Sequence, residues 1–255
     1  MINIVIPMAG AGSRFANVGY KKPKPFIDVN GKPMIARVLD NLYIPEAKYI
    51  LVARKEHIAN EADSVAFIKD RYNVEFIEID HLTEGMVCTV LYAHNIINNE
   101  TPLLLANSDQ LVDFDINYFI KDAKQRNLDG SILTFIDHER NPKWSYVKTN
   151  SNGIVTAVKE KEAISDTATV GVYFYSKGST FVSSSLDMIV RNDRVNNEFY
   201  TCPTYNYAIK NGNKIGIYNI DFEQMHGIGT PEDLNKFIGS ESENKIYNRY
   251  FSSLT

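Results

Sequence analysis

The chain has few of the residues that would indicate disulfide, zinc or membrane chemistry. Its two cysteines, Cys88 and Cys202, lie far apart and have no Cys or His at ligand spacing, which argues against a disulfide framework or a structural zinc site and predicts a cytoplasmic protein. No stretch approaches the roughly 20 apolar residues that span a bilayer, and the apolar N-terminus lacks the basic region of a signal peptide. We therefore expect neither export nor a membrane partner.

The chain also lacks an excess of basic charge. It has 27 Lys and Arg against 31 Asp and Glu, a net charge of −4, whereas binding to a nucleic acid depends on many cation-to-phosphate contacts. Its 44% hydrophobic and 23% charged residues are ordinary for a globular domain, so disordered and collagen-like classes are excluded. The charge is uneven: residues 1–35 hold five cations and one acid, giving +4, and the remainder carries −8. A compact basic segment of this kind suits a small anion rather than a nucleic acid.

Hydrophobic patterning in the first half alternates between strands and helices. Short apolar runs predict strands at 2–6, 48–52, 74–79 and 103–105, and stripes at helical spacing predict helices at 33–42, 58–68 and 86–97. This alternation is the signature of a parallel α/β sheet with crossover connections.

The pattern changes after about residue 128. Strands are predicted at 131–135, 144–148, 154–158, 169–175 and 214–218, and helices at 178–192, at 201–211 and from Thr230 onward. Asn152-Gly153 is a hairpin signal, and Thr230 with Asp233 forms a T-x-x-D capping box. We predict one continuous α/β domain over residues 1–255, with a Rossmann-like, mixed but mostly parallel sheet flanked by helices and a small antiparallel insertion.

A glycine-rich loop follows the first predicted strand. Residues 9–15 read A-G-A-G-S-R-F: the glycines let backbone N–H groups approach phosphate oxygens, and Arg14 can donate bidentate hydrogen bonds to them. Phe15 occupies the third glycine position of the dinucleotide fingerprint, and the G-K-[ST] ending of a P-loop is missing. Taken alone, this loop is more typical of a tight turn after a strand than of a phosphate site.

A second motif makes the glycine loop specific. Lys24 lies between two prolines, and Gly31-Lys32-Pro33-Met34 leads into the next helix. In this order the two segments resemble the signature of the sugar nucleotidyltransferases, G-x-G-[TS]-R followed by P-K-x-[LFM] and K-P-[ML]-[IL]. The resemblance extends over nearly the whole chain and implies a GT-A-like fold, with residues 1–128 as the nucleotide-binding half and 129–255 as the acceptor-binding half.

The resemblance also implies roles for individual residues. Arg14 and Lys24 would act on the triphosphate as the catalytic cations, and Asp109, at the end of an apolar strand, would bind Mg²⁺. The nucleotide-binding residues would be Ala9, Gly10, Ala11, Gly12, Ser13, Glu84 and Gly85. The acceptor-binding residues would be Glu160, Lys161 and Glu198, with Trp144 of the predicted hairpin as a further candidate.

Two positions depart from the family pattern. The strand that usually ends Gly-Asp ends here in Ser108-Asp109, which keeps the carboxylate. Gly227 stands where many members have an Asp that serves as a second metal ligand. We take Asp221 as the candidate replacement. Glu223 and His226 are alternatives, as is a metal held by Asp109 and phosphate oxygens alone.

The leading functional hypothesis is a Mg²⁺-dependent nucleotidyltransferase that joins an NTP to a sugar 1-phosphate, and the chain most resembles a capsule and surface-polysaccharide subgroup. One alternative is a cytidylyltransferase acting on a non-sugar phosphate such as phosphocholine, a glycerol phosphate or phosphoglutamine. Another is a GT-A glycosyltransferase, for which Asp113-Phe114-Asp115 offers a D-x-D sequence. A non-catalytic nucleotide sensor is the fourth. The sequence identifies neither the base, nor the acceptor, nor whether the chain forms a homo-oligomer.

Overall fold

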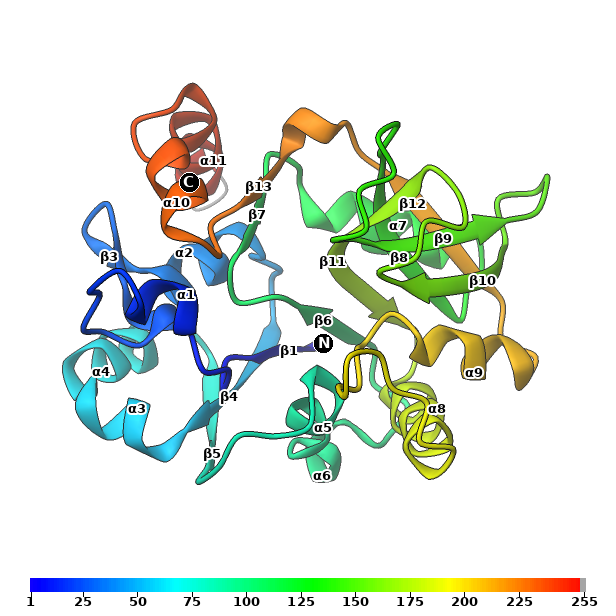
Figure 1. Ribbon diagram of the computed structural model, residues 1–255, viewed down its shortest axis with the longest axis horizontal. Coiled ribbons are helices and arrows are strands. Elements are labelled where there is room, and N and C mark those ends of the chain that lie inside the picture. The colour runs from blue at the N-terminus through cyan, green and yellow to red at the C-terminus, as the bar shows by residue number, and fades with distance from the viewer. Residues whose placement is uncertain (253–255) are drawn as a thin grey trace.

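A computed structural model describes residues 1–252 as a sheet with helices on both faces (Figure 1). The strands are β1 (Ile2–Pro7), β2 (Asp28–Val29), β3 (Lys32–Pro33), β4 (Ala47–Arg54), β5 (Val74–Ile79), β6 (Leu103–Ala106), β7 (Gln110–Val112), β8 (Gly130–Ile136), β9 (Ser145–Thr149), β10 (Val155–Glu160), β11 (Thr167–Tyr175), β12 (Ile215–Asn219) and β13 (Met225–Gly227). The α-helices are α1 (Ser13–Ala16), α2 (Met34–Asn41), α3 (Lys55–Asn60), α4 (Ala62–Arg71), α5 (Met86–Leu91), α6 (His94–Ile97), α7 (Ile116–Gln125), α8 (Gly178–Val190), α9 (Thr204–Lys210), α10 (Pro231–Phe237) and α11 (Glu241–Ser252). Two 3-10 helices are η1 (Lys24–Phe26) and η2 (Phe222–Gln224).

Within residues 1–252, nine strands form the main sheet. β5, β4, β1 and β6 are neighbours in that order and run parallel. β11 pairs antiparallel with β6 and β8, β12 adds parallel to β8, and the antiparallel β9–β10 hairpin joins through β9 to β11. The predicted mixed α/β sheet with an antiparallel insertion is confirmed.

The sheet buries a separate apolar core on each face. Along β1, Ile2, Ile4 and Ile6 belong to one core while Val5 belongs to the other, because successive strand residues point to opposite faces. The first core includes buried side chains of α2, α4, α7 and α10, and the second includes those of α5, α8 and α9. Strands with both faces covered are apolar throughout, which explains the continuous apolar runs in the sequence.

Most predicted elements are present, and β5 has the predicted bounds. The stripe at 86–97 is two helices, because Tyr92 and Ala93 donate backbone hydrogen bonds three residues back, to Thr89 and Val90, and so tighten the turn between α5 and α6. The stripe at 58–68 is likewise divided into α3 and α4. Sequence reasoning missed α1, α7, the short strands β2, β3, β7 and β13, and both 3-10 helices. The last helix, predicted from Thr230 onward, is divided into α10 and α11.

The last helices lie against the first half of the chain (Figure 1). Thr230 caps α10 as predicted, since its hydroxyl accepts a hydrogen bond from the Asp233 backbone at 3.1 Å. The Arg37 guanidinium lies 3.9 Å from the centre of the Tyr247 ring, and Asn30 donates to Glu243 at 2.6 Å. The C-terminal segment is therefore part of the packing around α2. No helix in residues 1–252 has the length and apolar character needed to cross a membrane.

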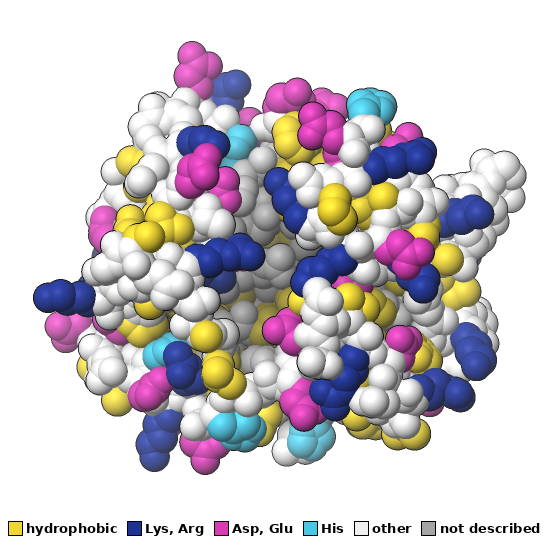
Figure 2. Space-filling model, viewed as in Figure 1, with side chains coloured by type: hydrophobic (Ala, Val, Ile, Leu, Met, Phe, Trp, Pro, Cys, Tyr) yellow, Lys and Arg dark blue, Asp and Glu magenta, His cyan; other side chains and the backbone are white. Residues whose placement is uncertain are grey.

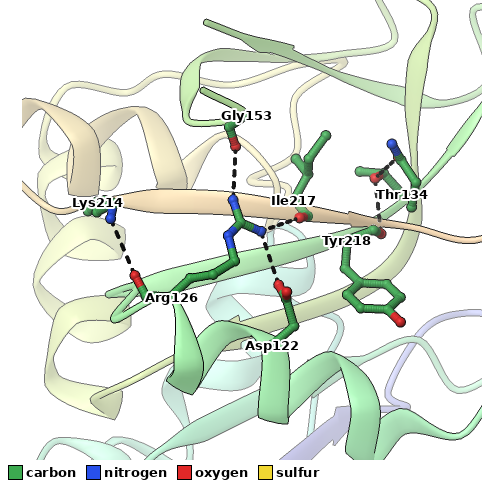
Figure 3. A network of polar contacts seen from close by, with 8 residues as sticks. Asp122, Arg126, Thr134, Gly153, Lys214, Ile217 and Tyr218 are labelled. Atoms are coloured by element: carbon green, nitrogen blue, oxygen red, sulfur yellow. Dashed lines mark hydrogen bonds and ion pairs between the residues drawn. The ribbon is translucent and has the colours of Figure 1, made fainter. Parts of the chain in front are cut away.

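Arg126, which follows α7, connects this helix to β12 and to the turn of the β9–β10 hairpin (Figure 3). Its guanidinium donates to the Asp122 carboxylate at 3.0 Å, to the backbone oxygen of Ile217 in β12 at 2.9 Å, and to that of Gly153 in the hairpin turn at 3.4 Å. Arg126 thus adds one contact between the turn of the β9–β10 hairpin and the sheet, besides the β9–β11 pairing.

We expect Arg126→Ala to lower the free energy of unfolding by about 1–2 kcal/mol, because it removes charge-assisted hydrogen bonds to partly buried backbone oxygens. Urea unfolding with an unchanged m-value measures the loss. Lys124→Ala, on the exposed side of the same helix, is the control and should change little. Equal midpoints for the two variants would contradict this role for Arg126.

Candidate active site

The strand order reverses at β1, which has β4 and β5 on one side and β6 on the other. In open α/β sheets, ligands bind outside the carboxyl ends of the strands at such a switch point. A cavity of about 350 Å³ lies there, lined by the loops that follow β1 and β6, by Lys24 and Pro25, and by the turn before α5. Figure 2 shows a hollow in the middle of this face with Lys and Arg side chains on both sides. The site is therefore open to an anionic ligand.

The glycine loop forms one wall of this cavity. Ala9, Gly10, Ala11 and Gly12 all line it. Gly12 has φ +63°, and a Cβ added there would lie 3.4 Å from the Cβ of Lys24, so both backbone conformation and close packing favour glycine. The loop therefore presents backbone rather than side chains to a ligand.

Ser13 and Arg14 belong to α1 and are exposed; neither lines the cavity. Phe15, in the position of the third glycine, is buried and packs edge-on against Tyr20 at 5.1 Å between ring centres. It anchors the loop to the core. The roles of Ser13 and Arg14 at the phosphates stay predictions.

Lys24 and Asp109 meet at the centre of the site. The Lys24 ammonium lies 2.7 Å from the Asp109 carboxylate, and the two side chains are 23% and 26% exposed. Lys24 opens η1, which the buried residues Pro25 and Phe26 fix to the core. The structure thus brings together a cation and a carboxylate, 85 residues apart in sequence, in a partly shielded cavity.

The loop after β13 holds Asp109 in place. Ile228 donates its backbone N–H to the Asp109 backbone oxygen at 2.8 Å. A Cβ added to Gly229 would lie 2.2 Å from Asp109 Oδ2, so only glycine leaves room for the carboxylate. The C-terminal G-I-G segment therefore positions Asp109, a role that sequence reasoning did not assign to it.

A divalent cation has one well-placed ligand here. The described side chains contain no cluster of three His, Cys, Asp or Glu suited to a metal. Mg²⁺ usually needs only one or two carboxylates, with waters and substrate phosphates completing its octahedral shell. Asp109 in a cavity that faces the glycine loop fits a Mg²⁺ that arrives with a triphosphate.

The proposed second ligand, Asp221, lies elsewhere. Its exposed side chain accepts a backbone hydrogen bond from η2 in a capping box with Gln224, and it lines neither cavity of the site. His226 lies in β13, half-buried, and burial lowers its pKa. The position of Gly227 faces Gln110, whose side-chain oxygen would lie 3.9 Å from an added Cβ. The geometry gives Asp221 a structural role, and its part in metal binding stays a prediction.

A second cavity, of about 250 Å³, adjoins the first. Met86, Asn107 and Glu198 line both, so they mark the junction. Sequence reasoning missed Met86 and Asn107. Only their places in the chain could have indicated these two residues: Asn107 directly follows a buried strand, and Met86 begins a helix after Gly85.

Three of the predicted acceptor residues line this second cavity: Trp144, Glu160 and Glu198. Glu160 is 9% exposed and its carboxylate accepts a short hydrogen bond from Ser145. Burial raises the pKa of Glu160, although the Ser145 hydroxyl and the Lys161 charge oppose this. A buried carboxylate in a polar cavity can accept hydrogen bonds from hydroxyl or amino groups of a ligand.

Lys161 lies beside the second cavity but does not line it. Its ammonium donates to the Tyr200 hydroxyl at 2.6 Å and lies 4.6 Å from the centre of that ring. Tyr200 itself lines the cavity. Binding of the acceptor phosphate by Lys161 stays a prediction, and it would require this hydrogen bond to be exchanged or shared.

Gly85 lines the first cavity, whereas Glu84 does not. Glu84 pairs with Arg194 at 2.8 Å, and the Arg194 guanidinium lies 4.2 Å from the centre of the Phe199 ring. A Cβ on Gly85 would lie 2.5 Å from Phe199 N. The turn before α5 is therefore clamped to the segment that carries Glu198.

We expect Arg194→Met to raise KM by about threefold or more for a substrate bound in either cavity, because the wall shared by the two cavities loses its clamp. The ion pair is largely exposed, so the free energy of unfolding should change by less than about 1 kcal/mol. Steady-state kinetics together with urea unfolding separates the two effects. Arg191→Met, at the end of α8, is the control and should leave KM unchanged. A change of KM for a substrate of only one cavity would contradict the role of Arg194 in the shared wall.

The D-x-D alternative finds no support in the geometry. Asp115 caps α7 by accepting a hydrogen bond from the Asn117 backbone at 2.9 Å. Neither Asp113 nor Asp115 lines the cavities. Of the three aspartates that follow β6, at 109, 113 and 115, only Asp109 lines a cavity of the site.

Fold and site together define an α/β protein with a cavity of about 350 Å³ at its switch point. The nucleotidyl transferase family model matches residues 4–235. The chain therefore belongs to the nucleotidyl transferase family, as its motifs predicted.

Individual relatives are distant. UTP–glucose-1-phosphate uridylyltransferase AglF of Haloferax volcanii is 24% identical over 212 residues, which are 74% of this chain and 84% of AglF. Mannose-1-phosphate guanylyltransferase catalytic subunit beta of Drosophila pseudoobscura pseudoobscura is 24% identical over 68% of this chain, and the match spans only 47% of that relative. The crystal structure of a nucleoside-diphosphate-sugar pyrophosphorylase from Vibrio cholerae superimposes with a TM-score of 0.78 and 22% identity, covering 93% of this chain and all of that one. This last likeness shows the fold.

Proposed function

We propose that this protein transfers a nucleotidyl group from an NTP to a sugar 1-phosphate and releases pyrophosphate. Membership of the nucleotidyl transferase family supports an enzyme, and the two relatives above carry names of sugar 1-phosphate nucleotidyltransferases. The observation that carries the proposal is the Lys24–Asp109 pair opposite the glycine loop, with a second polar cavity adjoining. We place the activity in the cytoplasm, in the supply of precursors for capsule or surface polysaccharide.

The reaction needs positioning more than acid–base catalysis. A phosphate oxygen of the acceptor attacks the α-phosphorus, a new P–O bond forms, and the bond to the bridging oxygen of the β-phosphate breaks as pyrophosphate leaves. The nucleophile is already anionic, so no general base is required. The protein must instead hold two anions in line and offset the charge on the transferring group.

Each part of the cavity has a task in this scheme. Backbone groups of the glycine loop would bind phosphate oxygens, Lys24 would offset their charge, and Asp109 would hold Mg²⁺. When bound, the ion would neutralise phosphate charge and fix its orientation. The acceptor would lie in the second cavity, where Glu160 can accept hydrogen bonds from its hydroxyl groups.

Pyrophosphate release tests this function directly. The four common NTPs, each with Mg²⁺, are combined with glucose 1-phosphate, mannose 1-phosphate, phosphocholine and glycerol 3-phosphate. Release that depends on both substrates and on a sugar 1-phosphate is the expected result. Release only with phosphocholine or glycerol phosphate would move the proposal to a non-sugar acceptor. Turnover of a nucleotide-sugar to free nucleoside diphosphate, with no pyrophosphate from any mixture, would favour a glycosyltransferase and contradict it.

A further inference from the structure

Lys143 lies at the rim of the second cavity, next to the single tryptophan of the chain. Its ammonium is 4.5 Å from the centre of the Trp144 ring, a cation–π contact. Trp144 in turn packs edge-on against Phe135, with 5.4 Å between ring centres. The lysine is exposed, yet an aromatic ring that is fixed to the core supports it.

The loop that carries Lys143 is held from within. The Asp137 carboxylate accepts hydrogen bonds from the buried Tyr146 hydroxyl at 2.6 Å and from the Asn141 backbone at 2.8 Å. The Asn141 side-chain oxygen accepts from the Lys143 backbone at 3.1 Å. This chain of bonds fixes the backbone of Lys143 relative to β9.

Charge in the second cavity favours a role for this lysine. Its other charged lining residues are the carboxylates of Glu160 and Glu198, which repel an entering phosphate. The Lys161 ammonium is engaged by Tyr200. Among the side chains that the structure describes, no carboxylate forms an ion pair with Lys143.

We propose that Lys143 binds an anionic oxygen group of the acceptor, an inference that rests on the proposed function for the identity of that acceptor. The group is either the phosphate itself or a carboxylate on the acceptor body. In both cases the ammonium supplies the positive charge that the walls of the second cavity otherwise lack.

Trp144 makes the proposal measurable without turnover. Because it is the only tryptophan, its fluorescence reports the second cavity alone. The wild-type protein is titrated with glucose 1-phosphate and with glucuronic acid 1-phosphate, in the presence and absence of an α,β-methylene analogue of the NTP. We expect a saturable change in the wild type and an about tenfold weaker Kd in Lys143→Met. Lys148→Met, which removes the same charge from the exposed side of β9, should bind like the wild type.

The two ligands distinguish the two anionic groups. If Lys143→Met weakens the binding of both compounds equally, the partner of Lys143 is the phosphate. If it weakens only the binding of glucuronic acid 1-phosphate, the partner is the carboxylate. Unchanged Kd values in Lys143→Met, or no fluorescence response of the wild type to either compound at millimolar concentration, would overturn the proposal. Absence of pyrophosphate release by the wild type refutes the proposed function separately, because the titration does not depend on turnover.

Discussion

Lys24→Met should lower kcat/KM by about two to three orders of magnitude, the usual cost of removing one preorganised charge from a transition state. The ammonium lies inside the cavity, 2.7 Å from Asp109, where it can contact both the triphosphate and the carboxylate. Methionine keeps an unbranched side chain out to Cε and removes the charged amino group. Steady-state pyrophosphate release measures the loss, and an unchanged thermal midpoint shows that the protein remains folded.

The matched control for this prediction is Lys21→Met. Lys21 is exposed and lies three residues before Lys24, outside the first cavity. Lys21→Met should keep near-normal kcat/KM. A small decrease is expected at low salt, where Lys21 attracts the anionic substrate, and it should vanish at high salt, which screens this attraction. Similar losses in both variants would mean that the basic segment acts only through its overall charge.

Asp109→Asn should lower kcat by about two orders of magnitude or more and shift the Mg²⁺ requirement to higher concentration, since Mg²⁺ favours charged oxygen ligands. Asparagine has nearly the same shape, so the close approach of Gly229 is preserved. Titration of Mn²⁺ in the presence of NTP, followed by electron paramagnetic resonance, measures metal binding independently of turnover.

Asp221→Asn is the paired variant, because the sequence made Asp221 a candidate ligand. Its carboxylate caps η2, so we expect near-normal Mn²⁺ binding and a small loss of stability. If Asp221→Asn weakened Mn²⁺ binding and Asp109→Asn did not, the assignment of the metal to Asp109 would be wrong.

The sequence predicted the elements whose signal is local. β1 is a β-branched run that ends in a turn, β5 has apolar residues at 74, 76, 77 and 79, and the start of α10 is marked by Thr230 and Asp233. The missed α7 also had local signals, with Asp115 as its N-cap and apolar residues at 116, 119, 120 and 123. β7 and β13 have only three residues each and exist because they pair with one another, 115 positions apart, so neither shows a pattern of its own.

The candidate site was predictable as a set of residue types but not as an arrangement. Motifs marked Lys24 and Asp109 separately, whereas their 2.7 Å contact depends on how the loops after β1 and β6 meet. The sequence did not predict which way the charged side chains point. Glu84 turns to Arg194 and Lys161 to Tyr200, both through contacts between distant segments. Lys143 belongs to none of the motifs that the sequence offered, and only the fold shows that it borders the second cavity.

The most direct test of nucleotidyl transfer follows two labelled phosphates of one nucleotide. The NTP that gives pyrophosphate release is supplied with ³²P at the α position in one reaction and at the γ position in another, with Mg²⁺ and a sugar 1-phosphate. Our account predicts that the α label appears in a nucleotide-diphosphate-sugar and the γ label in pyrophosphate, in equal amounts. Recovery of the γ label as inorganic phosphate, with the α label left in nucleoside diphosphate, would contradict it.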